Sequence, residues 1–141
     1  MLEKAINIAT KAHKGQKDKA EQPYILHLIR VMLKGKTEEE QICGMLHDLL
    51  EDTNWTADDL KKEGFPESVI QTIQTVTKLE GETYDDFIGR ILLDETAIRV
   101  KINDLEDNMA IRRLTEITPK DAERLNKYLL AYKRLTDKSE A

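Results

Sequence analysis

The chain of 141 residues is poor in cysteine, proline, glycine and aromatic residues, and these shortages exclude several kinds of structure. One cysteine, Cys43, cannot form a disulfide framework or a zinc site made of several thiolates. Because it lies in the apolar run 42–46, we expect Cys43 to pack in the core. Only three prolines and six glycines interrupt the chain, so long helices can run without breaks.

Long apolar runs and an excess of positive charge are also missing. No stretch approaches the roughly 20 apolar residues that a membrane span needs, and residues 1–5 contain no signal-peptide core. We therefore expect a soluble, cytoplasmic protein without a membrane partner. The net charge is -5 and no basic stripe dominates, so we expect no nucleic-acid partner either. An anionic ligand would have to meet a local group of cations or a metal ion.

Apolar residues recur at helical spacing along nearly the whole chain, and strand-like alternation is not seen. We predict an all-α fold, with residues 1–141 forming one domain, a helical bundle of roughly seven or eight helices. Thr56 followed by Asp59 predicts the start of a short helix that ends at Gly64. The other helices are expected at about 2–12, 24–33, 38–52, 66–79, 83–93, 95–114 and 119–137.

The expected helix 38–52 carries ionisable residues inside an apolar sequence. Met45, Leu46, Leu49 and Leu50 indicate burial, yet four ionisable residues lie among them: His47, Asp48, Glu51 and Asp52. Residues four apart lie on one face of a helix, so we expect these four to form one polar ridge. Unpaired buried carboxylates cost about several kcal/mol each, and a divalent cation removes that penalty. This helix contains no lysine that could do so instead.

Two further segments contain candidate ligands. His27 lies in the apolar helix 24–33, and Asp104 shares a helical stripe with Lys101 and Asn108. Each of these features alone has an ordinary structural explanation, as a core histidine or a solvated helix face. Two histidines and two aspartates without cysteine suit Mn²⁺, Fe²⁺, Zn²⁺ or Mg²⁺, and their spacing does not choose among these ions.

In this order on predicted helices, these residues resemble the HD-domain phosphohydrolases. They resemble most closely the alarmone hydrolases, which include the hydrolase domain of the bifunctional guanosine tetraphosphate synthetase/hydrolases and their stand-alone relatives. The matching segments lie within roughly residues 5–115 and are 12–16, 23–27, 46–53, 76–79, 101–104 and 108–109.

The resemblance implies a role for nine residues. A single metal ion, usually manganese in that family, would be held by His27, His47, Asp48 and Asp104. Glu51 and Asp52 match the acidic pair that orients or activates the attacking water and handles the leaving group. Asn108 matches a residue near the nucleotide sugar, and Lys19 and Lys78 match cations near the base or phosphates. The implied reaction removes the 3′-pyrophosphate of guanosine 3′-diphosphate 5′-di- or triphosphate.

The chain also departs from the family pattern. Asp18 replaces an arginine that stacks on guanine, and Glu21 and Leu28 stand where a glycine and a proline are usual. Residues 105–107 read Leu-Glu-Asp instead of Arg-Leu-His, and Ile111 stands near the position of a threonine. The metal-binding and water-activating residues are therefore retained, whereas the surface that recognises the base is altered.

Two other functions remain open at this point. The same metal site could act on a different nucleotide or phosphoester, because the base-recognition residues have diverged. A non-catalytic module that senses a nucleotide or a metal is the other possibility, although an acidic pair such as Glu51 and Asp52 has little use in a pure binder.

Overall fold

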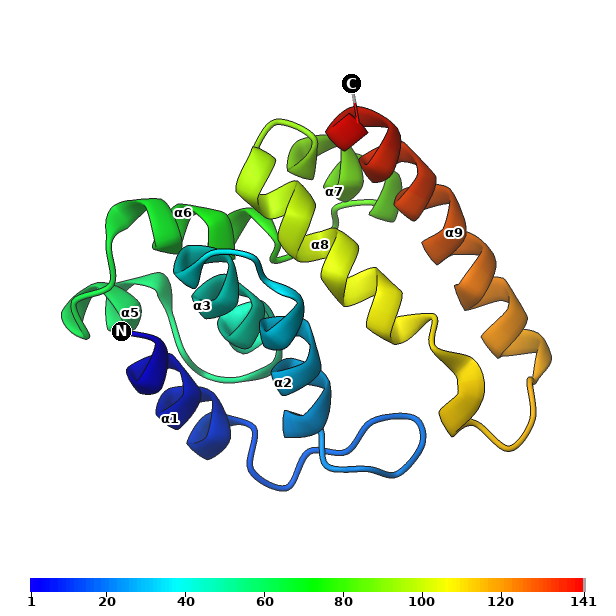
Figure 1. The fold of residues 1–141 in the computed structure, drawn as a ribbon, viewed down its shortest axis with the longest axis horizontal. Coiled ribbons are helices and arrows are strands. Elements are labelled where there is room, and N and C mark those ends of the chain that lie inside the picture. The colour runs from blue at the N-terminus through cyan, green and yellow to red at the C-terminus, as the bar shows by residue number, and fades with distance from the viewer. Residues whose placement is uncertain (141) are drawn as a thin grey trace.

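The computed structural model describes residues 1–140 (Figure 1). These residues form nine α-helices and one 3-10 turn, joined by loops. No strand occurs within that range, so the predicted all-α fold is confirmed. None of these helices is both long and apolar enough to cross a membrane. The elements are α1 (Leu2–Ala12), α2 (Ile25–Lys34), α3 (Glu38–Leu46), α4 (Leu49–Asp52), α5 (Ala57–Lys62), α6 (Glu67–Thr75), α7 (Tyr84–Ile91), α8 (Glu95–Asn108), η1 (Ile111–Arg113) and α9 (Pro119–Glu140).

Helix α3 lies at the centre of the bundle and packs against α1, α2, α6 and α8. Its residues Cys43, Met45 and Leu46 have no solvent exposure, as expected for Cys43. Helix α8 packs against both α2 and α3 (Figure 1). Helix α9 in turn packs against α8 and α7. The bundle thereby brings α8 side by side with α2 and α3, from which it is far apart in the sequence.

Local signals set several helix starts. Thr56 accepts a hydrogen bond from the amide of Asp59, and the Asp59 carboxylate accepts one from the amide of Thr56. This capping box confirms the predicted start of α5. The same reciprocal pair of bonds joins Thr118 and Asp121 at the start of α9. Caps of this kind join residues three apart, so they can be recognised without knowing the tertiary fold.

The expected continuous helix over 38–52 is wrong, because the chain leaves the helix at His47 and Asp48 and resumes as α4. Nδ1 of His47 lies 2.6 Å from the carbonyl oxygen of Gly44. That oxygen is the acceptor which the amide of Asp48 would use in an unbroken helix, so the side chain competes with the backbone. The predicted polar ridge therefore does not form on one helix. Two other helices are also shorter than expected, since α6 ends at Thr75 and α8 at Asn108.

Gly44 allows α3 to approach α2 closely. A Cβ atom at this position would lie 3.3 Å from backbone atoms of Val31 and Met32. These are main-chain atoms of α2, which cannot rotate away as a flexible side chain could. The contact lies about one turn from His27 on α2 and from His47 at the end of α3, so it helps to set the distance between the two imidazoles.

We predict that Gly44→Ala destabilises the protein by about 1–3 kcal/mol, because the added methyl group forces two packed helices apart. Urea denaturation followed by circular dichroism measures the change. Gly89→Ala is the matched control, since a Cβ there would meet only the Nη2 atom of Arg134, at 3.8 Å. We expect this control to stabilise α7 by about 0.5–1 kcal/mol. Equal effects of the two substitutions would contradict the proposed close contact.

Candidate metal centre

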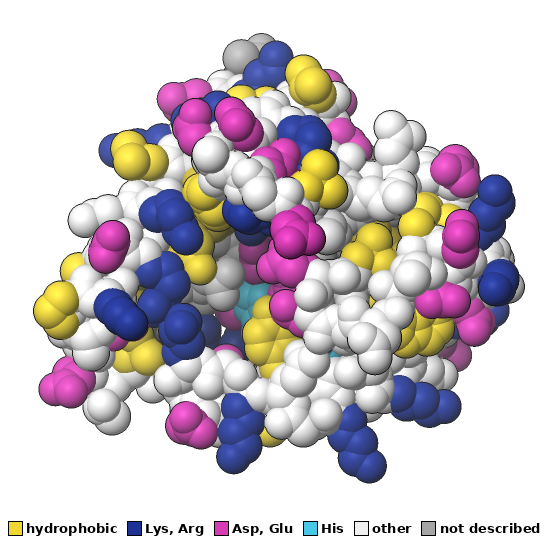
Figure 2. All heavy atoms as spheres, turned by 180° about the vertical axis from the view of Figure 1, so that it is seen from behind, with side chains coloured by type: hydrophobic (Ala, Val, Ile, Leu, Met, Phe, Trp, Pro, Cys, Tyr) yellow, Lys and Arg dark blue, Asp and Glu magenta, His cyan; other side chains and the backbone are white. Residues whose placement is uncertain are grey.

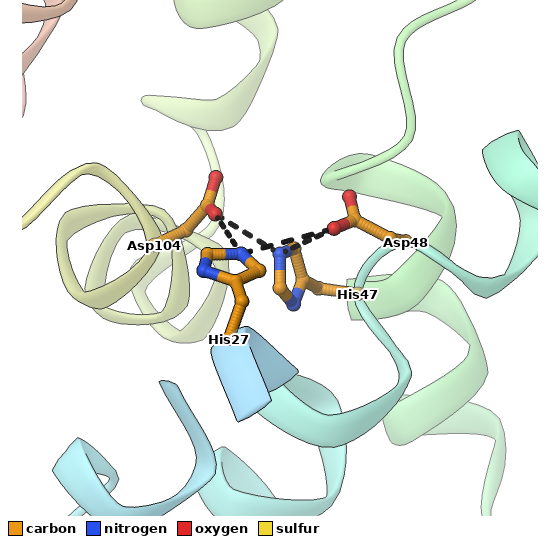
Figure 3. A group of neighbouring side chains, drawn as sticks. All are labelled: His27, His47, Asp48 and Asp104. Carbon is orange, nitrogen blue, oxygen red and sulfur yellow. Dashed lines mark hydrogen bonds and ion pairs between the residues drawn. The ribbon is translucent and has the colours of Figure 1, made fainter. Parts of the chain in front are cut away.

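Four side chains converge where α2, the break between α3 and α4, and α8 meet (Figure 3). Nε2 of His47 lies 3.0 Å from Oδ2 of Asp48 and 3.1 Å from Oδ1 of Asp104. Nε2 of His27 lies 3.0 Å from the same Asp104 oxygen and 3.9 Å from Oδ2 of Asp48. One nitrogen or oxygen from each residue therefore lies within 4.8 Å of all the others.

The donor set and its spacing suit a divalent cation. Ligands bound at about 2.1 Å on neighbouring corners of an octahedron lie about 3 Å apart, close to the distances seen here. His27, His47 and Asp104 are buried, and Nε2 of His27 has no hydrogen bond of good geometry. Two imidazoles and two carboxylates are ligands that Mn²⁺, Fe²⁺ and Zn²⁺ accept. The residues present thus fit a metal ion.

Neighbouring side chains hold the two carboxylates of the cluster. The hydroxyl of Tyr24 donates to Oδ2 of Asp48. Nζ of Lys101 donates to Oδ2 of Asp104 over 2.9 Å, and Nδ2 of Asn108 donates to Oδ1 of the same residue over 3.1 Å. These contacts orient the carboxylates towards the centre.

The charges of the cluster shift the pKa values of its members. Burial alone would lower the pKa of His47, but the carboxylates of Asp48 and Asp104 outweigh it and raise this pKa well above the usual value. The pKa of His27 is also raised despite its burial, chiefly by its contacts with the carboxylates of Asp104 and Asp107. The positive charges of Lys101 and His47 outweigh burial and hold the pKa of Asp104 well below its usual range. Without a metal, the two carboxylates therefore favour the protonated form of both imidazoles.

A cavity of about 690 Å³ opens above this cluster. His27, Asp48 and Asp104 lie in its wall, and so do all five remaining residues predicted from the sequence: Lys19, Glu51, Asp52, Lys78 and Asn108. Figure 2 looks at the hollowed face, where dark blue Lys and Arg side chains crowd one side and a cyan imidazole is visible in its depth. Eight of the nine predicted site residues therefore line one cavity. The ninth, His47, contacts the lining residues Asp48 and Asp104.

The acidic pair lies on α4, next to the metal ligands. Oε1 of Glu51 accepts a hydrogen bond of 3.2 Å from the amide of Lys78, which joins α4 to the segment after α6. Partial burial, together with the negative charges of Asp48 and Glu51, raises the pKa of Asp52 to about 6. A carboxylate with a raised pKa and an open side towards the cavity is suited to accept a proton.

Only some of the altered residues lie at the cavity. Asp18 does line the cavity, but its Oδ1 accepts hydrogen bonds from the amides of Ala20 and Gln22 at 2.8 and 2.9 Å. It therefore closes the loop that contains Glu21, whose φ of 62° is the kind of backbone conformation that glycine favours.

The interpretation of residues 105–107 as part of the base-recognition surface is wrong for this structure, since none of the three lines the cavity. Leu105 is in the core, and Glu106 turns towards Lys34 and Tyr132. Asp107 is buried against His27. On a helix, residues 101, 104 and 108 share a face and those between 104 and 108 point away from it.

Several residues that line or support the site were assigned no role there from the sequence. Tyr24 and Lys101 contact the ligand carboxylates, and their place beside predicted ligands on the same helical segments was an available signal. The far wall of the cavity comes from η1 and α9, where Arg113, Arg124 and Lys127 add positive charge. No local pattern marks these three residues as facing the metal cluster.

Comparison with known proteins finds relatives with similar sequences. No protein-family model matches it. The guanosine-3′,5′-bis(diphosphate) 3′-pyrophosphohydrolase of Aquifex aeolicus is 34% identical in an alignment of 120 residues that covers 77% of this chain and 17% of that protein. The bifunctional (p)ppGpp synthase/hydrolase SpoT of Escherichia coli K12 is 29% identical over 139 residues, covering 88% of this chain and 19% of SpoT.

A solved structure has the same fold. It is described as a metazoan orthologue of SpoT that hydrolyses ppGpp, and it superposes with a TM-score of 0.77 at 23% identity. The match covers 98% of this chain and 84% of that one. By contrast, the chain spans less than a fifth of the two curated relatives described above.

We predict that metal binding releases protons. Because the pKa values of His27 and His47 are raised, protons compete with the ion for both imidazoles, and each ligating nitrogen must be free of its proton to bind the ion. Affinity for Mn²⁺ should therefore rise as the pH increases, with about one or two protons released per ion near pH 7. Calorimetric titrations in buffers of different ionisation enthalpy count these protons. A binding heat that is the same in every buffer would contradict the prediction.

Proposed function

We propose that this chain, an HD-domain homologue of the guanosine-3′,5′-bis(diphosphate) 3′-pyrophosphohydrolases, is a metal-dependent phosphohydrolase that removes the 3′-pyrophosphate of guanosine 3′-diphosphate 5′-di- or triphosphate. The observation that carries this proposal is the cluster of His27, His47, Asp48 and Asp104 at the floor of a nucleotide-sized cavity. We extend the proposal to one hydrolase domain over residues 1–141 and to action in the cytoplasm, where a nucleotide substrate would be met.

In this proposal the four clustered residues hold Mn²⁺. The ion would polarise a phosphoryl oxygen and lower the pKa of a water molecule. The cavity lies on the same side of the cluster as the carboxylates of Glu51 and Asp52. These two residues would orient the attacking water and accept its proton as the water oxygen bonds to phosphorus. The bond between that phosphorus and the 3′-oxygen breaks, and the 3′-oxygen takes up a proton from the acidic pair, which yields pyrophosphate and a nucleoside 5′-di- or triphosphate with a free 3′-hydroxyl.

Cations on the cavity wall would meet the charge of the substrate. Nζ atoms of Lys19 and Lys78 have no ion-pair partner among residues 1–140, so they are available to phosphate oxygens. Asn108 borders the cavity beside Asp104 and would face the nucleotide sugar. A polyphosphate therefore finds a positive wall in a protein whose net charge is -5.

We predict that the Mn²⁺-loaded protein converts guanosine 3′-diphosphate 5′-diphosphate and water to GDP and pyrophosphate. His47→Ala and Asp104→Ala should abolish both metal binding and turnover. Glu51→Gln and Asp52→Asn should lower kcat about 10²–10⁴-fold with the metal content unchanged. The measurements are product analysis by anion-exchange chromatography and elemental analysis of each variant.

The matched control is Asp58→Asn, which removes one exposed carboxylate of α5 that does not line the cavity. It should keep full activity. No turnover with Mn²⁺, Mg²⁺, Fe²⁺ or Zn²⁺ would contradict the proposal. Tight binding of the nucleotide without turnover would favour a non-catalytic sensor instead.

The same chemistry on a different nucleotide is a second candidate, and the loop around Asp18 favours it. That carboxylate is engaged by the amides of Ala20 and Gln22, so this side of the cavity presents no flat cation for a base to stack on. If the base is not read here, guanosine and adenosine nucleotides with the same 3′-phosphates should have kcat/KM values within about tenfold of each other. A panel of such nucleotides, scored for phosphate and pyrophosphate release, measures the ratio. A preference for guanosine above a hundredfold would rule this candidate out.

A further inference from the structure

Asp107 is buried beside the metal cluster without belonging to it. It lies one turn after Asp104 on α8, and only 3% of its surface is exposed. It does not line the cavity, so it has no contact with a substrate there. Burying an ionised carboxylate costs free energy unless other groups pair with it. The partners of Asp107 therefore need to be identified.

Its main contact is with a proposed metal ligand. Oδ2 of Asp107 lies 2.6 Å from Nδ1 of His27, on the opposite side of the imidazole from the cluster. An ionised carboxylate can only accept a hydrogen bond, so Nδ1 carries the proton. Nε2 of the same ring lies 3.0 Å from Oδ1 of Asp104 and faces the centre of the cluster. The two carboxylates of α8 thus contact the two nitrogens of one imidazole.

Two arginines hold the Asp107 carboxylate in place. Nε of Arg30 donates to its Oδ1 over 2.7 Å and Nη2 to its Oδ2 over 3.2 Å, a two-pronged contact between α2 and α8. Nη2 of Arg113, on η1, lies 3.6 Å from Oδ2 and donates to the main-chain carbonyl of Asp107 over 3.0 Å. These cations compensate the buried charge and restrict the rotation of the carboxylate.

We propose that Asp107 is a positioning residue for His27. By accepting the Nδ1 proton, it selects the one tautomer in which the Nε2 lone pair is free for the metal, and it stops the ring from rotating. A hydrogen-bonded partner of this kind also makes the imidazole a stronger ligand. The inference depends on the proposed function only in requiring a divalent ion at the cluster.

The test compares metal affinity and ring tautomer in Asp107→Ala and Asp107→Asn. Calorimetric titration with Mn²⁺ alone should show affinity about 10–100-fold weaker for Asp107→Ala. Asp107→Asn keeps an acceptor oxygen without the charge, so we expect a loss of about three- to tenfold. In Zn²⁺-loaded, ¹⁵N-labelled protein, the downfield Nδ1 proton of His27 should disappear in Asp107→Ala and shift upfield in Asp107→Asn. A purely structural ion pair would leave this resonance in place.

Glu106→Gln is the matched control. It makes the same change of charge one residue earlier on α8, where the carboxylate contacts Lys34 and Tyr132 and not the cluster. Its affinity for Mn²⁺ should stay within about twofold of the wild type. Asp107 variants that match this control in affinity and tautomer would overturn this inference and leave the proposed function standing. A wild-type protein that binds neither Mn²⁺ nor Zn²⁺ would overturn the proposed function and this inference with it. Should Asp107→Ala fail to fold, Asp107→Asn against Glu106→Gln still decides the matter.

Discussion

Two carboxylates, Asp48 and Asp104, both lie about 3 Å from Nε2 of His47, and the rest of the site is arranged around this contact. Like charges at such distances repel strongly in a buried place, so a positive charge must lie between them. In the metal-free protein these carboxylates favour the protonated imidazoles, and the pKa values of His27 and His47 are raised for that reason. A divalent ion would take over that role when the protons leave.

Close packing of α2 against α3 brings the residues of this contact together. Gly44 lets α3 lie against the backbone of α2, which brings His47 to His27. The break after Leu46 then turns Asp48 towards the cluster and places α4, with Glu51 and Asp52, at the mouth of the cavity. Negative charge is concentrated at the floor and positive charge on the walls, an arrangement that suits a metal ion and a phosphorylated ligand together.

Local features could be predicted from the sequence and features that depend on packing could not. The caps at Thr56 and Thr118 involve residues three apart, so the starts of α5 and α9 were readable. The interruption at His47 was not, because it depends on a hydrogen bond from a side chain to the backbone that competes with an otherwise favourable helix. Residues 105–107 were assigned to base recognition by alignment of a motif, whereas the rotation of α8 against its neighbours turns all three away from the cavity.

The sequence by itself determined the all-α class and the candidate ligands, because ionisable residues stand out when they interrupt an apolar helical pattern. Only the tertiary structure decided how they meet and what supports them. His47 and Asp104 are 57 positions apart, and His27 and Asp107 are 80 positions apart. Contacts at such separations depend on the crossing angle and rotation of packed helices, which are set by the whole core and by no local pattern. Asp107 illustrates the difference: its residue type suggested an altered substrate pocket, while its position places it behind a metal ligand.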